Sequence, residues 1–129
     1  MAKYYENLGN MTPDKLIAGN NIPIHTASAT VKSGEGKLTR GTILAMSAGT
    51  AGTGKLVILG TPAVTNETLV AYGVLCDSID ATGADTVAEI YVSGQFNKGV
   101  LAVKANYIMT TADIKELRDG GIYVESVVD

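Results

Sequence analysis

The strongest constraint on the fold comes from residues 71–101, AYGVLCDSIDATGADTVAEIYVSGQFNKGVL. They contain two strand-like stretches joined by an acidic turn. In the second stretch the apolar residues Ala88, Ile90 and Val92 alternate with polar or aromatic neighbours. This period of two predicts a strand that buries one face. Gly94 falls on the buried set and Phe96 resumes it, so we expect the strand to bend or bulge at Gly94.

The remaining patterns predict a mainly β fold with one short C-terminal helix. Leu56–Leu59 is a short continuous apolar run, which is typical of a strand covered on both faces. Gly73, inside another strand-like segment, marks a close approach of two backbones. Further strands are expected at residues 29–32, 37–40, 42–46, 69–76 and 122–128, the first two as halves of a hairpin around a glycine turn.

One helix is signalled at both of its ends. Thr110 stands three residues before Asp113, a spacing that predicts a capping box and a helix beginning at Thr110. Gly120 and Gly121 follow the last helical positions and should end it. The helix has a narrow apolar stripe, so we expect it to lie on a sheet rather than join a helical bundle.

The first 28 residues differ from the rest, because glycine, asparagine and proline interrupt every short apolar stretch. We therefore predict an N-terminal arm at residues 1–28 and one globular domain at residues 29–129. Ile22–Pro23–Ile24 in this arm is expected to be extended, since a residue before proline avoids the helical region and proline suits an edge or free strand.

Composition excludes several classes of function. A chain of 129 residues is one domain that can bury a modest core. A net charge of −3 with scattered basic residues gives no electrostatic footprint for nucleic acid. No apolar run approaches the roughly 20 residues of a membrane span, and the N-terminus lacks a signal-peptide core. The single cysteine, Cys76, is predicted to be a small buried hydrophobe.

Gly49–Lys55 is the most suggestive chemical motif, because GTAGTGK fits the spacing of a phosphate-binding loop up to the lysine. The next residue is Leu56 where that loop needs serine or threonine, and the segment that follows is β-type where the anion site needs a helix N-terminus. We therefore interpret the motif as a flexible hairpin loop.

Two other residue sets fail as catalytic or metal sites. Asp77, Asp80 and Asp85 lie around Gly83 but do not match the ligand spacing of a calcium loop. His25 is the only histidine, and it is far in sequence from Cys76. The sequence therefore predicts no catalytic residue, no cofactor and no metal ligand, and the protein is not expected to be an enzyme.

The chain resembles the lambda-type bacteriophage head decoration proteins in three motifs that occur in the same order. These are residues 40–45 (RGTILA), residues 71–101 and residues 116–122 (ELRDGGI). The resemblance implies a β-clip-like fold, a ribbon bent at two places, and a homotrimer. It implies a structural role in the virion: trimers on the outer surface of the phage head, at three-fold and quasi-three-fold sites of the expanded shell, holding it against the pressure of packaged DNA.

The same resemblance implies the major capsid (coat) protein as the partner, synthesis in the bacterial host cytoplasm, and no nucleic acid, membrane or small-molecule partner. The arm would be flexible in the free trimer and would become ordered on the capsid, where it would add an extended segment to an edge strand of the coat protein. The candidate capsid contacts are Tyr5, Ile22, Pro23 and Ile24, and the candidate bend or turn glycines are Gly41, Gly73, Gly94, Gly120 and Gly121.

Two alternatives remain at this point. A trimeric β-clip enzyme of the dUTPase type would need a carboxylate-bearing turn, a phosphate-binding serine motif and magnesium, and none of these motifs is found in the sequence. A phage tail or surface-binding module would have no catalytic motif either, so the sequence does not separate it from a head protein.

Overall fold

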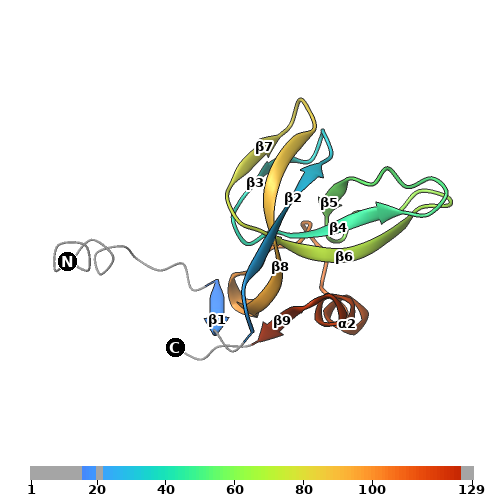
Figure 1. The fold of residues 1–129 in the computed structure, drawn as a ribbon. Coiled ribbons are helices and arrows are strands. Elements are labelled where there is room, and N and C mark those ends of the chain that lie inside the picture. The colour runs from blue at the N-terminus through green and yellow to red at the C-terminus, as the bar shows by residue number, and fades with distance from the viewer. Residues whose placement is uncertain (1–15, 20–21, 126–129) are drawn as a thin grey trace, which may run out of the picture.

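The computed structural model describes residues 16–19 and 22–125, and Tyr5 therefore lies outside the described residues. The fold is mainly β with one short helix near the C-terminus, which confirms the predicted class (Figure 1). None of the helices in these two ranges is long and apolar enough to cross a membrane. The elements are β1 (Ile17–Gly19), β2 (His25–Val31), β3 (Gly36–Leu38), β4 (Ile43–Ala48), β5 (Leu56–Ile58), β6 (Thr68–Leu75), β7 (Ile79–Ala81), β8 (Thr86–Asn97), the 3-10 turn η1 (Lys98–Val100), α2 (Thr111–Gly120) and β9 (Ile122–Glu125).

The main sheet closes into a small β-barrel. Strands β2, β5, β4 and β6 pair in that order, and β8 pairs with both β2 and β6 (Figure 1). Closure removes the open edges that a flat sheet would present to other strands. The β-clip description and the trimer stay predictions.

Strand β8 changes partners at the predicted bend. Up to Ser93 it belongs to the barrel, and from Gly94 to Asn97 it pairs with β9. Gly94 has φ +142°, a value that L side chains rarely adopt. Ile90 before the bend and Phe96 after it are both fully buried, as the alternation predicts. The sequence therefore located correctly the point where this strand leaves the barrel.

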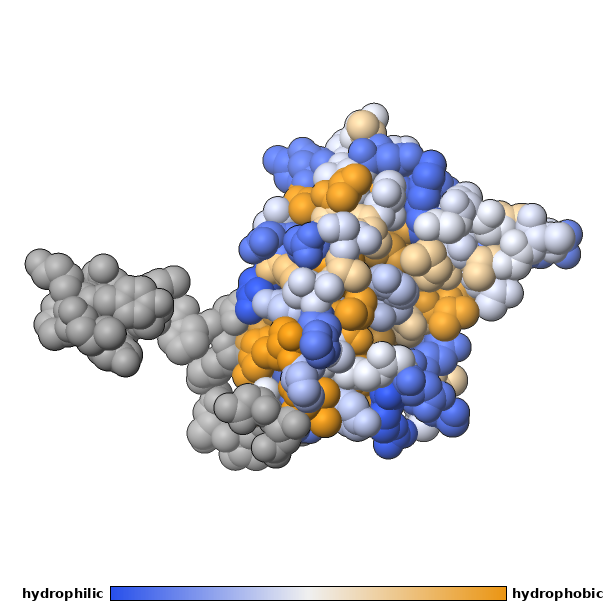
Figure 2. All heavy atoms as spheres, in the orientation of Figure 1, coloured by the Kyte–Doolittle hydropathy of each residue, from blue (hydrophilic) through white to orange (hydrophobic). Residues whose placement is uncertain are grey.

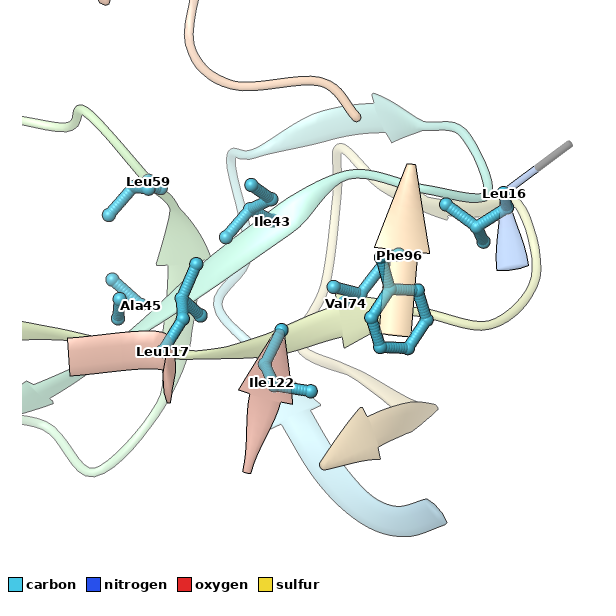
Figure 3. Packing of buried hydrophobic residues seen from close by; sticks show 9 residues of the cluster. Leu16, Ile43, Ala45, Leu59, Val74, Phe96, Leu117 and Ile122 are labelled. Atoms are coloured by element: carbon cyan, nitrogen blue, oxygen red, sulfur yellow. The ribbon is translucent and has the colours of Figure 1, made fainter. Parts of the chain in front are cut away.

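The core has two clusters, one on each face of the barrel wall. Along β4, Leu44 faces the inner cluster, to which every barrel strand contributes, while Ile43 and Ala45 face the helix-side cluster. In the helix-side cluster, Figure 3 shows Leu117 of α2 near Ala45 and Ile122 of β9 on the side of Val74 and Phe96. The inner cluster contains Val31, Leu38, Leu44, Leu56, Leu75, Ala81, Ala88 and Ile90.

Strand β5 is covered on both sides, as its continuous apolar run predicts, because Leu56 and Val57 are both buried. The close approach predicted at Gly73 is also confirmed. A Cβ atom at Gly73 would lie 2.4 Å from the carbonyl oxygen of Tyr91. This contact lies where β6 pairs with β8 and closes the barrel.

The predicted hairpin between residues 29–32 and 37–40 is wrong, although both segments contain strands. β2 pairs with β8 on one edge, and at Val31, where the hairpin would begin, its other edge is paired with Leu56 of β5. β3 pairs instead with β7, and the N–H of Gly34 donates to the carbonyl of Ala81 at 2.7 Å. The glycine turn therefore carries the chain away from β2 rather than back along it.

Helix α2 begins and ends as the sequence predicts. Thr110 and Asp113 form the capping box, with the Asp113 N–H donating to Thr110 Oγ1 at 3.1 Å. At the other end Gly121 adopts φ +109°, and its N–H donates to the carbonyls of Leu117 and Arg118. The carbonyl of Gly121 accepts from the N–H of Gly94 at 3.0 Å, which links the helix end to the bend in β8.

The two glycines at this helix end should respond differently to substitution. Gly121→Ala places a side chain in the left-handed region, with its Cβ 3.3 Å from that of Ser93, and we expect it to lower the free energy of unfolding by about 1–2 kcal/mol. Gly120→Ala meets no atom within 4 Å and replaces a helical glycine, so it should be neutral or slightly stabilising. Urea unfolding of the two variants measures this difference, and equal stabilities would contradict the assigned cap.

Candidate functional site

Three of the candidate contact residues, Ile22, Pro23 and Ile24, lie between β1 and β2 at one end of the molecule (Figure 1). Ile22 is half-buried and Pro23 is exposed, while the Ile24 residue is 43% exposed. We call residues 22–24 the contact segment. Two parts of the predicted arm, β1 and the first residues of β2, are paired with β8. Whether residues 1–28 act as an arm stays a prediction.

The backbone of the contact segment is held mainly by two side chains of β8. Gln95 Oε1 accepts from the N–H of Ile22 at 3.3 Å. Ser93 Oγ donates to the carbonyl of Pro23 at 2.7 Å and accepts from the N–H of His25 at 3.1 Å. These bonds replace a regular strand ladder, and the register of β2 against β8 shifts at the next residue. The segment therefore crosses the bent part of β8 at a fixed place.

The bent end of β8 is the middle strand of a small sheet with β1 and β9. β1 pairs antiparallel to β8 and β9 pairs parallel to it. Among the strands that the structure describes, neither β1 nor β9 pairs with a second strand. Unpaired strand edges present N–H and C=O groups that another chain can bind. Gln95 Nε2 also donates to Glu125 Oε2 of β9 at 2.8 Å. The amide of Gln95 therefore bonds to the contact segment and to β9.

Apolar surface is found at this corner and elsewhere. Figure 2 shows apolar side chains over the region where Figure 1 places β1 and the bent end of β8. Ile24 is the exposed large hydrophobic residue of the contact segment. Other exposed large hydrophobic residues lie on several elements and loops: Val64, Val70, Val87, Val100 and Ile108.

The remaining bend and turn candidates lie along the barrel wall and at the helix end. Gly41 has φ +97° just before β4, and its N–H donates to the carbonyl of Leu75 at 3.0 Å. Gly73 lies in β6, whereas Gly120 closes α2. These positions shape the fold, and a direct role for them in binding stays a prediction.

The glycine-rich loop at residues 49–55 leads into a strand, β5, as the interpretation of it as a hairpin loop requires. Glu67 binds Ser47, which lies just before this loop. The Glu67 carboxylate accepts hydrogen bonds from Ser47 Oγ and from the N–H of Val64, and these bonds lower the pKa of Glu67. Lys55 Nζ, which would meet a phosphate in a nucleotide loop, pairs with Asp85 Oδ2 at 2.6 Å. The geometry therefore lacks the helix N-terminus that a phosphate-binding loop provides.

The other chemical candidates also make structural contacts. Asp80 Oδ1 accepts from the N–H and hydroxyl of Thr82, and both bonds lower the pKa of Asp80. Cys76 is buried, as predicted, and burial raises the pKa of its thiol. His25 is exposed. Within residues 16–19 and 22–125 no group of three or more His, Cys, Asp or Glu residues is placed to hold a metal ion.

The sequence analysis missed the residues that organise this corner. Ser93 and Gln95 flank Gly94, and their polar side chains looked like the solvated face of a strand. Parity indicates that Ser93 and Gln95, two apart on a strand, share a face, but it does not indicate which segment crosses that face. Arg40 was also missed as a structural residue. Its Nη1 donates to the carbonyl of Cys76 at 2.8 Å and to the hydroxyl of Tyr91 at 2.7 Å.

Comparison with known proteins identifies one family. The family model described as bacteriophage lambda head decoration protein D matches residues 6–122, which include the barrel, the helix and the contact segment. No curated protein sequence matches the chain significantly.

Proposed function

The chain belongs to the bacteriophage lambda head decoration protein D family, and on this basis we propose that it coats the expanded phage head as a homotrimer. A capsid decoration role follows from the family itself, which is one of structural phage proteins. The proposal adds that trimers bind the coat protein at three-fold and quasi-three-fold sites on the outer surface and stabilise the shell against packaging pressure.

The family match carries this proposal, and the geometry of the contact segment supports it. Binding by strand addition needs an extended segment whose side chains project to a partner. None of the strands that the structure describes pairs with the segment around Pro23, and Ile24 projects from it with 43% exposure. Because proline restricts the backbone, such a segment loses little conformational entropy on binding. β1 and β9, each of which pairs with β8 and with no other described strand, lie at the same end of the molecule (Figure 1).

The trimer would turn weak contacts into a stable attachment. Three contact segments on one particle bind with an effective concentration set by their spacing, and the combined affinity can exceed the single affinity by about 10²–10⁴-fold. No catalytic step is assigned to the protein in this proposal. Its effect on the capsid is mechanical, since each trimer would join neighbouring coat proteins.

Co-sedimentation with phage shells tests this function. We expect the purified protein to coat expanded shells and to leave unexpanded shells bare, because the three-fold sites are completed by expansion. Light scattering of the free protein should give the mass of a trimer. Equal coating of both shell forms, or no coating of either, would contradict the proposal, and stabilisation by dUTP with magnesium would favour the enzymatic alternative instead.

A further inference from the structure

Two polar side chains on either side of the bend in β8 control the shape of the contact segment. Ser93 and Gln95 stand on either side of Gly94, and together they bind three polar groups of the crossing backbone: the Ile22 N–H, the Pro23 carbonyl and the His25 N–H. A segment of this length ordinarily obtains such bonds from a neighbouring strand or from water. Here both partners are side chains, and their hydrogen bonds fix where the segment crosses β8.

The site is built closely around the Gln95 amide. Gln95 is 9% exposed, and both ends of its amide are used, since Oε1 accepts from Ile22 and Nε2 donates to Glu125. Gly19 of β1 provides the space, because a Cβ atom there would come within 2.9 Å of Gln95 Oε1. A buried amide with partners on both sides has one favourable orientation. Gln95 therefore connects the contact segment to the C-terminal strand β9.

We infer that Ser93 and Gln95 form a clamp that holds residues 22–24 in the conformation that binds the coat protein. The inference rests on the proposed function and adds its positioning residues. A clamped segment is ordered before it meets the shell, whereas a released segment must lose that freedom on binding and binds more weakly. The clamp residues need not touch the coat protein, so they act through the segment.

Two substitutions, each of which removes one side of the clamp, are expected to leave the barrel intact. Ser93→Ala removes the hydroxyl that serves Pro23 and His25, and Gln95→Met keeps a side chain of similar length without the amide. Ser28→Ala is the matched control, since Ser28 Oγ also joins β2 to β8, through Glu89 Oε1 at 2.6 Å, but lies outside the contact segment.

Amide hydrogen exchange and shell binding are then measured on the full chain. We expect exchange at His25 to rise about tenfold in Ser93→Ala and exchange at Ile22 to rise about tenfold in Gln95→Met, as the loss of one hydrogen bond predicts. Exchange at Ala29, in the barrel part of β2, should not change. Affinity for expanded shells should fall about tenfold in both variants and stay at the wild-type value in Ser28→Ala.

The outcomes separate this inference from the function on which it rests. Wild-type protein that fails to coat expanded shells would refute the decoration role and the clamp together. Wild-type protein that coats them, with both variants binding as tightly or more tightly, would refute the clamp alone. Faster exchange at Ala29 as well as at the clamped amides would show that the variants loosen the barrel, and would also refute a local clamp.

Discussion

Replacing Gly73 with alanine is expected to lower the free energy of unfolding by about 3 kcal/mol, the upper end of the usual cost of overpacking. The new Cβ would lie 2.4 Å from the carbonyl oxygen of Tyr91 and 2.7 Å from Cγ2 of Ile90. The first of these atoms belongs to the backbone of β8, so it can move only if β6 and β8 separate. That separation would open the barrel at the pairs that close it, Val74 with Tyr91 and Leu75 with Ile90.

A matched glycine distinguishes this steric effect from the general effect of adding a methyl group. Gly83 lies in the turn before β8, and a Cβ atom there meets nothing within 4 Å. Gly83→Ala should therefore change stability by no more than about 0.5 kcal/mol. Urea unfolding at one fixed protein concentration compares the variants, since association would make stability depend on concentration. A Gly73→Ala protein as stable as Gly83→Ala would show that the two strands do not meet as described.

Features that depend on local pattern were predictable from the sequence. The alternation ending in Gly94 and Phe96 located the bend of β8, and the spacing of Thr110 and Asp113 located the start of α2. In each case the residues that specify the element are near neighbours in the chain. Such signals survive folding because they act through backbone geometry and short-range hydrogen bonds.

The pairing of distant strands was not predictable in the same way. Residues 29–32 and 37–40 have strand character and enclose a glycine turn, yet β2 pairs with β8 and β5 while β3 pairs with β7. Periodicity reports which face of a strand is buried and says nothing of its neighbour. Choosing between a hairpin and barrel closure requires knowledge of how all strands compete for the available edges.

The candidate site also combines residues that the sequence analysis named with residues that it did not. The proline predicts that Ile22, Pro23 and Ile24 are extended, and their role as capsid contacts, which the family resemblance implies, stays a prediction. Ser93 and Gln95 are about 70 residues away in sequence, and their partners are backbone atoms that carry no sequence signature. Only a three-dimensional arrangement connects them to residues 22–24.

Deleting residues 1–14 is expected to weaken binding to expanded shells by at least about a hundredfold, while the protein still folds. A decoration protein of this family is expected to use its N-terminal residues, including Tyr5, as contacts, and each trimer would lose three such contacts at once. All residues that the structure describes remain in this variant, including Leu16, which is 2% exposed in the helix-side cluster. The folded domain should therefore keep its unfolding midpoint.

The position of the cut decides what such a truncation can show. A longer deletion of residues 1–27 would remove Leu16, all of β1 and the first residues of β2, and it would also remove the pairing of those residues with β8. Loss of binding in that protein would not separate contact from folding, because the helix-side cluster would lose Leu16 and the packing of Ile17. Comparing both truncations by unfolding and by shell co-sedimentation makes the distinction. If the protein lacking residues 1–14 coats expanded shells as tightly as the full chain, residues 1–14, Tyr5 among them, contribute nothing to binding, and any contact made by the arm lies in its remaining residues 15–28.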